Sequence, residues 1–206
     1  CPALYTVLAH LGFFPKEELN HLRQVNSLLE GHPVSKIPGI EATTGPLGQG
    51  LSFGNGIALA LKMDKKPNRV YVLLGDGELQ EGQIWEAAMT SVQYKLDNVT
   101  VFVDNYKLQQ TNFVRAIKPV EPIGQKFAAF GWNVINVANG HDFDEIRDAI
   151  RRAWKVKLKP TAIVCETIKG KGVPFTLNKP GYHGVALSKE EMAEAIPILE
   201  KELQQL

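Results

Sequence analysis

Two short polar motifs, each placed directly after an apolar run, are the residues of this sequence best suited to chemistry. Gly75-Asp76-Gly77 follows the apolar run 70–74, and Asp104-Asn105 follows the apolar run 99–103. Carboxylate and amide oxygens suit Mg²⁺ or Ca²⁺, and glycines let backbone N–H groups approach a phosphate. The two motifs together predict a site for a metal-bound diphosphate. Alone, Gly75-Asp76-Gly77 is equally compatible with a simple tight turn between a strand and a helix.

The elements that must position these motifs form a β-α-β unit. Both apolar runs are rich in valine and have the length of one buried strand. Between them, segment 80–95 carries apolar residues at spacings of three and four, which is typical of an amphipathic helix. Open α/β sheets bind ligands at the carboxyl ends of their strands. We therefore expect both motifs to lie at the same edge of a parallel sheet.

The rest of the chain continues the alternation of helices and strands. Strands are expected over 132–137 and 161–167, and helices over 1–12, 15–24, 45–61, 122–130, 142–157 and 188–206. This pattern predicts an α/β fold, with a parallel sheet and helices on both of its faces, in a single domain over residues 1–206. Segment 108–122 has no clear period and is expected to be a loop.

Two helix starts carry recognisable caps. Asp142 is the expected N-cap of the helix 142–157, so the neighbouring His141 is assigned a structural role. Ser188-Lys189-Glu190-Glu191 is a capping box, and the helix that follows it is amphipathic, which indicates packing.

Composition limits the kinds of partner. The chain has 206 residues, with 23 basic and 22 acidic side chains, so no overall field favours nucleic acid or an acidic membrane surface. Its two cysteines, Cys1 and Cys165, lie far apart, and it has neither a secretory signal nor an apolar run of membrane-spanning length. We expect a cytoplasmic protein. Because Cys1 stands inside what looks like a running helix, we also expect that an N-terminal segment is missing.

Longer motifs around the two sites resemble one family. GDG, followed after about a helix and a strand by Asn, is the thiamine-diphosphate motif. GDGELQEGQIWEA and VDNYKLQQT, together with the upstream elements GHP and TTGPLGQG, resemble the transketolases in particular. The resemblance covers essentially the whole chain and corresponds to the N-terminal, diphosphate-binding (PP) domain of that family, which some organisms encode as a separate subunit. It implies the thiamine-diphosphate-binding fold, with thiamine diphosphate and Mg²⁺ or Ca²⁺ as cofactors.

The resemblance also implies which residues hold the cofactors. The implied cofactor contacts are Gly45, Pro46, Leu47, Gly75, Asp76, Gly77, Glu78, Asn105 and Ile168. The implied metal ligands are Asp76, Asn105 and a backbone carbonyl, that of Leu108 or Lys107. The glycines at 45–50 can also be explained by close helix packing. A dinucleotide site is rejected there, because 41–44 is a poor strand and Pro46 interrupts the turn.

Three further residues are candidates for the reaction itself. By resemblance, His32 in the GHP loop and His183 in the HG element contact the sugar substrate. Glu81 is implied in a buried acidic network near a subunit interface, which links two active sites. From the residues alone, each histidine could equally be an exposed loop residue, and Glu81 could simply favour the start of its helix.

The family's activity implies a partner for this chain. Transketolases move a two-carbon ketol unit from a ketose phosphate to an aldose, in the pentose phosphate pathway, and the cofactor carries the reacting carbon. In the family, the glutamate that activates the cofactor belongs to a pyrimidine-binding domain, and nothing in this sequence resembles that domain. We therefore expect the partner to be a C-terminal transketolase subunit, in a homo- or hetero-oligomer.

One departure from the family pattern concerns the metal. Related subunits have Asp-x-Asn-Lys-Leu-Gln after the second strand, whereas this chain has Asn105 one place early and Tyr106 in the ligand position. A neutral phenol is a poor ligand for a hard cation. We expect the loop to shift so that Asn105 reaches the metal. Two alternatives stay open, a related thiamine-diphosphate enzyme such as deoxyxylulose-phosphate synthase and a non-catalytic, degenerate partner subunit.

Overall fold

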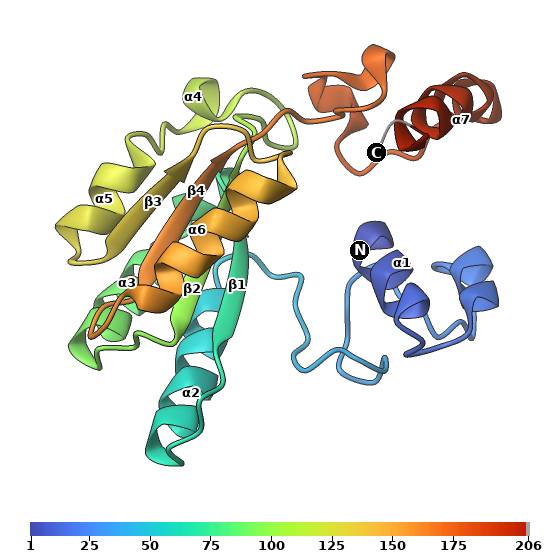
Figure 1. Ribbon diagram of the computed structural model, residues 1–206. Helices are drawn as coiled ribbons and strands as arrows, with labels where there is room; N and C mark the ends of the chain where they lie inside the picture. Colours follow the sequence, from blue (N-terminus) through green and yellow to red (C-terminus); the bar gives the residue numbers. More distant parts are fainter. Residues whose placement is uncertain (205–206) are drawn as a thin grey trace.

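A four-stranded parallel sheet forms the centre of this computed structural model, which describes residues 1–204 (Figure 1). The strands are β1 (Val70–Gly75), β2 (Val99–Asn105), β3 (Asn133–Val137) and β4 (Thr161–Glu166). Their order across the sheet is β1-β2-β4-β3, so the last strand of the chain lies between β2 and β3. The expected parallel α/β architecture is confirmed.

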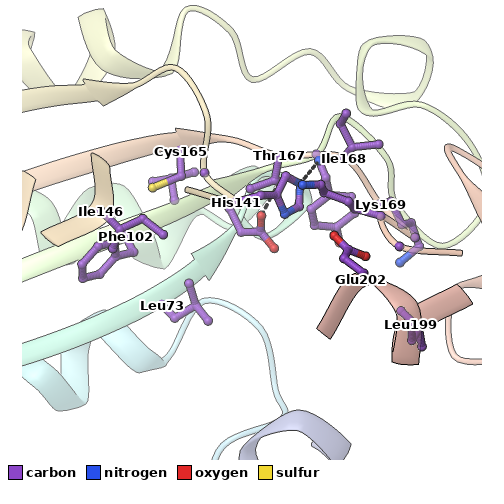
Figure 2. Close-up of a pocket in the computed structure, with 17 residues that line it drawn as sticks. Leu73, Phe102, His141, Ile146, Cys165, Thr167, Ile168, Lys169, Leu199 and Glu202 are labelled. Carbon is purple, nitrogen blue, oxygen red and sulfur yellow. Dashed lines mark hydrogen bonds between the residues drawn. The ribbon is translucent and has the colours of Figure 1, made fainter. Parts of the chain in front are cut away.

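Helices cover both faces of this sheet, as expected. On one face, α2 (Gly50–Met63), α3 (Gly82–Gln93) and α5 (Ile123–Ala129) pack on the strands in the largest apolar cluster. On the other face, α6 (Phe143–Lys155) packs on β3 and β4, and its Ile146 joins Phe102 of β2 in the same cluster (Figure 2). That second face is open over β1, where the side chain of Leu73 is 73% exposed.

The N-terminal segment packs on itself rather than on a face of the sheet. Helix α1 (Pro2–His10) and the 3₁₀ helix Lys16–His21 share a separate apolar cluster (Figure 1). The α-helix expected over 15–24 is therefore shorter and more tightly wound. The chain reverses soon after it, since Arg23 and Asn26 both adopt positive φ angles, which an α-helix does not allow.

Other expected boundaries shift by a few residues. The helix expected over 80–95 starts with a separate 3₁₀ turn, Gly77–Gln80, before α3. The expected loop 108–122 contains a short helix, α4 (Val114–Ile117). Helix α7 (Lys189–Leu203) has the predicted capping box at Ser188, and the last two residues of the expected helix lie outside the described part of the chain. Within residues 1–204, no helix is both long and apolar enough to cross a membrane.

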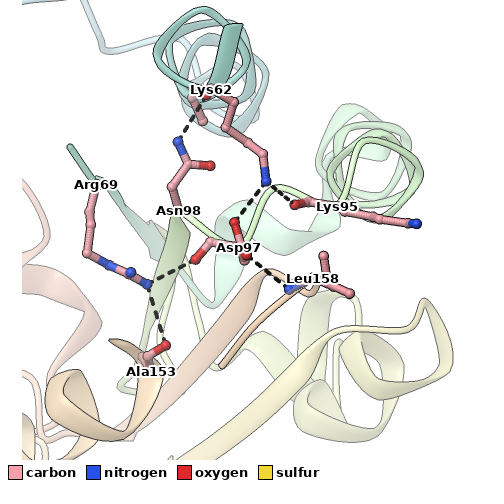
Figure 3. A network of polar contacts seen from close by, with 8 residues as sticks. Lys62, Arg69, Lys95, Asp97, Asn98, Ala153 and Leu158 are labelled. Atoms are coloured by element: carbon pink, nitrogen blue, oxygen red, sulfur yellow. Dashed lines mark hydrogen bonds and ion pairs between the residues drawn. The ribbon is translucent and has the colours of Figure 1, made fainter. Parts of the chain in front are cut away.

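Polar contacts close the amino end of the sheet, opposite the edge where the motifs lie. The Asp97 carboxylate accepts from Lys62 Nζ at 2.9 Å and from the Leu158 N–H at 3.0 Å, which joins α2 to the turn after α6 (Figure 3). Arg69 donates to the carbonyls of Asp97 (3.0 Å) and Ala153 (3.4 Å). These contacts connect α2, α6 and the segments that precede β1 and β2, so that the carboxyl edge is carried on a fixed frame.

A buried amide connects α2 to α3, and its removal tests how far the frame depends on it. Asn55 donates to the Ala87 carbonyl at 2.8 Å and accepts from Ser91 Oγ at 2.7 Å. Asn55→Ala leaves these buried groups with fewer partners, so we expect the free energy of unfolding to fall by about 2 kcal/mol. Urea denaturation measures it, with the exposed Gln93→Ala on α3 as a control within about 0.5 kcal/mol of the wild type. Equal stability of the two variants would contradict this role.

Candidate functional site

Asp76 lies at the carboxyl end of β1 and is the N-cap of the following 3₁₀ turn. Its side chain is 1% exposed, and its two oxygens accept the N–H groups of Gly77 at 2.8 Å and Lys107 at 2.6 Å. In the sheet, Gly75 of β1 stands in register with Asp104 of β2. Both polar motifs therefore lie side by side at one edge of the sheet, as the sequence predicts.

The electrostatics of Asp76 fit a bound cation. Burial, together with the nearby charge of Asp104, raises the pKa of this carboxyl to about 6, against the opposing effect of the Gly77 and Lys107 N–H donors. A carboxylate that is costly to ionise gains most from a metal ion, which replaces the lost hydration with ligand bonds. The oxygen donors at this edge match the preference of Mg²⁺ and Ca²⁺.

Glu78 joins the two glycine-containing loops. One carboxylate oxygen accepts the Gly48 N–H at 2.9 Å, and the other accepts the Gly75 N–H at 3.1 Å. The loop 45–50 and the end of β1 are thus held together, although 27 positions separate Gly48 from Gly75. Because both oxygens of Glu78 already hold backbone groups, its role as a direct cofactor contact stays a prediction.

Two glycines let the 45–50 loop approach its neighbours closely. A Cβ on Gly48, whose φ is +87°, would lie 2.8 Å from the Cβ of Glu81. A Cβ on Gly45, whose φ is +147°, would lie 2.9 Å from the His32 ring. The structure therefore brings His32, the 45–50 loop and Glu81 together. His32, Pro46 and Glu81 are exposed, and Leu47 is 60% exposed, so these side chains are free to meet a ligand or a partner.

Asn105 is buried, and its amide nitrogen is bonded to two glutamates. Its side chain is 2% exposed, and Nδ2 donates to Glu121 Oε1 at 3.0 Å and to Glu166 Oε1 at 2.8 Å. Both donors of the amide are thus used by glutamates from other segments. These bonds involve Nδ2 and not Oδ1, the atom that would bind a metal, so Asn105 as a metal ligand stays a prediction.

Tyr106 takes the place beside Asp76. Burial first, and then the charges of Asp76, Asp104 and Glu78, raises the pKa of its phenol to about 12, so the group stays protonated. A Cβ built on Gly75 would lie 4.0 Å from the phenol oxygen. Of the two carbonyls expected to bind metal, that of Lys107 already accepts the Val114 N–H at 3.0 Å, which favours Leu108.

The glycine-rich loop 168–174 lies over Tyr106. Lys169 Nζ is 5.0 Å from the centre of the Tyr106 ring, at cation–π distance. Burial, and next the charge of Lys169, holds the pKa of His183 below its ordinary value, which places this histidine near the same lysine. Ile168 is 46% exposed. A cavity of about 800 Å³ lies beside this loop, and its lining includes Asp104, Tyr106, His141, Ile168 and Lys169 (Figure 2).

Sequence reasoning missed several groups at this edge. Thr167 donates a hydrogen bond to the Asp104 carboxylate, and Lys107 forms an ion pair of 2.6 Å with Glu166. These contacts depend on β4 lying next to β2, which no local pattern predicts. The basic, glycine-rich composition of 168–174 was the one available signal for Lys169.

The comparisons with known proteins agree with this geometry. Residues 1–202 match the family described as transketolase, thiamine diphosphate binding domain. The chain belongs to the transketolase family. It is 44% identical over 202 residues to the 6-deoxy-6-sulfo-D-fructose transketolase subunit SqwG of Clostridium sp. (strain MSTE9), a match that covers 98% of this chain and 73% of the relative.

Two more relatives extend the comparison. One subunit of the apulose-4-phosphate transketolase of Phocaeicola vulgatus is 40% identical over 207 residues, covering 97% of this chain and 73% of that relative. The crystal structure of transketolase from Campylobacter jejuni superimposes with a TM-score of 0.84 at 33% identity, over 89% of this chain and 30% of that one. The chain is therefore similar both to separate transketolase subunits and to one part of a longer transketolase.

The raised pKa of Asp76 gives a pH dependence of stability. Between its ordinary value of 3.8 and about 6, the folded chain binds the proton that the unfolded chain has lost, so this carboxyl destabilises the fold increasingly as pH rises through that window. Relative to Asp76→Ala, the wild type should lose about 2.4 kcal/mol between pH 4 and pH 7 without divalent cations. Urea denaturation across that range measures this, with the exposed Asp64→Ala as control. A constant difference would contradict the buried-charge account.

The bridging role of Glu78 gives a second prediction. Glu78→Gln keeps one acceptor oxygen and turns an NH₂ group toward the other N–H, so one of the two bonds is lost. The amide of Gly48 or Gly75 should exchange with deuterium about tenfold faster, as expected for one lost hydrogen bond. Glu86→Gln, on the exposed side of α3, should leave both rates unchanged. Equal rates in the two variants would show that Glu78 does not hold the loops.

Proposed function

We propose that this chain is the N-terminal subunit of a two-part transketolase, which transfers a two-carbon ketol unit between ketose and aldose phosphates. The observation that carries the proposal is the Glu78 bridge, because it holds the 45–50 loop against Gly75, beside the buried carboxylate of Asp76. A metal-bound diphosphate needs an anionic ligand for the cation and a backbone that can be approached closely, which the glycines of these two segments allow. Membership of the transketolase family supports the same reaction.

The chain's own residues would hold the cofactors as follows. Asp76 and the Leu108 carbonyl would bind Mg²⁺ or Ca²⁺, with Asn105 as a further candidate. The backbone of Gly75 and Gly77 would lie beside the diphosphate; in this structure their N–H groups donate to Glu78 and Asp76. Gly45, Pro46, Leu47 and Ile168 would lie along the remainder of thiamine diphosphate, which when bound supplies the nucleophilic carbon and the electron sink of the reaction. Among residues 1–204, no cluster of three His, Cys, Asp or Glu side chains forms a metal site, so cofactor oxygens would complete the coordination.

The two histidines would contact the sugar. His183 has a pKa held below its ordinary value, so at neutral pH its ring carries a free lone pair and can accept a hydrogen bond or a proton from a substrate hydroxyl. His32 is exposed beside Gly45. Lys169 and Lys171 place positive charge on the glycine-rich loop 168–174, near His183. This charge suits a substrate with an anionic end. The named substrates of two relatives, a sulfo-sugar and a sugar phosphate, both have such a group.

A partner subunit would complete the site. The sequence offers no counterpart of the glutamate that activates the cofactor in the family, and the side chains of Leu47 and Glu81 are exposed in this chain. Two relatives, of each of which this chain covers 73%, are named as transketolase subunits. We therefore propose that the partner of this surface is a C-terminal subunit that carries the pyrimidine-binding domain.

The direct test is a coupled assay of xylulose 5-phosphate and ribose 5-phosphate. We expect no ketol transfer by the chain alone and activity when the pyrimidine-domain subunit is added, since the missing acid–base group is worth about 10²–10⁴ in rate.

Asp76→Ala should abolish Mg²⁺-dependent cofactor binding to the assembly, and Asp64→Ala should not. Turnover by the isolated chain would contradict the half-site. Turnover of pyruvate with glyceraldehyde 3-phosphate instead would favour a deoxyxylulose-phosphate synthase.

Tyr106 supports a second candidate, a partner subunit that has lost catalysis, because a neutral phenol lies beside Asp76. Tyr106→Asn returns an amide to that position and should lower the Mg²⁺ concentration for half-maximal cofactor binding about tenfold, equivalent to ~1.4 kcal/mol. Tyr106→Phe is the matched control, which keeps the ring and should change little. Calorimetric titration of the assembly measures both. A large loss of cofactor affinity in Tyr106→Phe would show that the phenol oxygen itself contributes to the site. Inactivity of the assembled wild type with every sugar tested would favour the degenerate subunit.

A further inference from the structure

His141 makes a contact that an ordinary turn residue does not need. Its Nε2 accepts a hydrogen bond from the Ile168 N–H at 2.8 Å. In Figure 2, the imidazole points from the turn before α6 across to the first residue of the glycine-rich loop 168–174. The two residues are 27 positions apart. The contact therefore joins the turn before α6 to the loop after β4 at the carboxyl edge of the sheet.

The turn that carries His141 is fixed against the end of β4. The Gly140 N–H donates to the Glu166 carbonyl at 2.7 Å, and a Cβ at position 140 would lie 2.6 Å from Thr167 Cγ2 and 2.9 Å from the Cβ of Cys165. Only glycine fits so close to the strand. The backbone beside the imidazole therefore has little freedom to move.

Side-chain contacts hold the same turn from its other side. Asn139 Oδ1 accepts the His141 N–H at 3.2 Å, and the Asn139 N–H donates to Glu145 Oε2 at 3.0 Å. Asp142 caps α6 by accepting the N–H groups of Asp144 and Glu145. His141 is thus attached to the fixed start of α6, which can support the glycine-rich loop 168–174.

The loop that receives the contact contains two glycines in left-handed conformations. Gly170 and Gly172 have φ angles of +76° and +91°. Gly170 packs against Thr176, whose hydroxyl donates to the Gly170 carbonyl at 3.2 Å, so the middle of the loop is held by the 3₁₀ turn that follows it. Where the loop leaves the sheet, Thr167 bonds to Asp104, and the next residue is held by His141.

We propose that His141 is a positioning residue that fixes the start of the glycine-rich loop, and with it the place of Ile168 and Lys169 over the candidate cofactor site. The imidazole acts as an acceptor, so Nδ1 carries its proton and Nε2 is free. The effect on the cofactor rests on the proposed function, because it assumes that Ile168 contacts thiamine diphosphate. The effect on the loop position is independent of the proposed function.

The first test uses amide exchange in the full chain without cofactor. His141→Leu removes the acceptor, so the Ile168 amide should exchange about tenfold faster, as expected for one hydrogen bond. His141→Gln keeps an acceptor at a similar reach and should stay within about threefold of the wild type. The exposed His21→Leu is the control. Unchanged exchange in His141→Leu, or equal rates in the Leu and Gln variants, would overturn the proposal.

The second test needs no variant to fold. Long-range ¹H–¹⁵N NMR of the wild-type chain should show His141 as the Nδ1–H tautomer, with Nε2 unprotonated. An Nε2–H tautomer would overturn the proposal, because a protonated nitrogen cannot accept the Ile168 N–H.

The third test addresses the cofactor in the assembled enzyme. His141→Leu should raise the thiamine-diphosphate concentration for half-maximal activity about fivefold with kcat largely kept, and His141→Gln should restore it. A shift that Gln does not rescue would overturn the role of the acceptor. If the wild-type assembly binds no thiamine diphosphate, the proposed function fails, and the exchange and NMR results still decide whether His141 holds the loop.

Discussion

The buried carboxylate of Asp76 is the interaction on which the arrangement of this site depends. The chain places it at the end of β1 with almost no exposure and next to Asp104, so its charge is costly until a cation is present. Two backbone N–H groups orient it and partly offset that cost. The fold thereby keeps a hard oxygen ligand in a defined position before any ligand arrives, which is the arrangement that preorganised sites require.

The groups at the carboxyl edge keep their relative positions because polar contacts fix the elements at the amino edge. The contacts of Asp97 fix α2, the start of β2 and the turn after α6 to one another. On that frame, the functional edge is assembled from separate segments by single polar bridges. Glu78 holds the 45–50 loop to β1, and His141 holds the glycine-rich loop to α6. Connections that would otherwise be variable are thus tied to regular elements, while the exposed side of the site is free for substrate and partner.

The sequence predicts those parts of the fold that depend on neighbouring residues. The β-α-β unit from β1 to β2, the caps at Asp142 and Ser188, and the meeting of the two polar motifs all follow from local patterns. The place of Asn105 does not, because its partners Glu121 and Glu166 come from a distant loop and from β4. Insertion of β4 between β2 and β3 decides the contact with Glu166, and strand order is a property of the whole sheet. A family motif read in register likewise could not show that Tyr106 would lie among three carboxylates.

We propose that one edge of the sheet, built around Asp76, binds a metal-bound diphosphate. Hydrogen–deuterium exchange of the assembled enzyme, with and without thiamine diphosphate and Mg²⁺, tests it most directly. Protection should increase together in segments 45–48, 75–78 and 106–108 and at Ile168, and only when the metal is present. Protection confined to other segments, or protection at this edge that does not need a divalent cation, would contradict it.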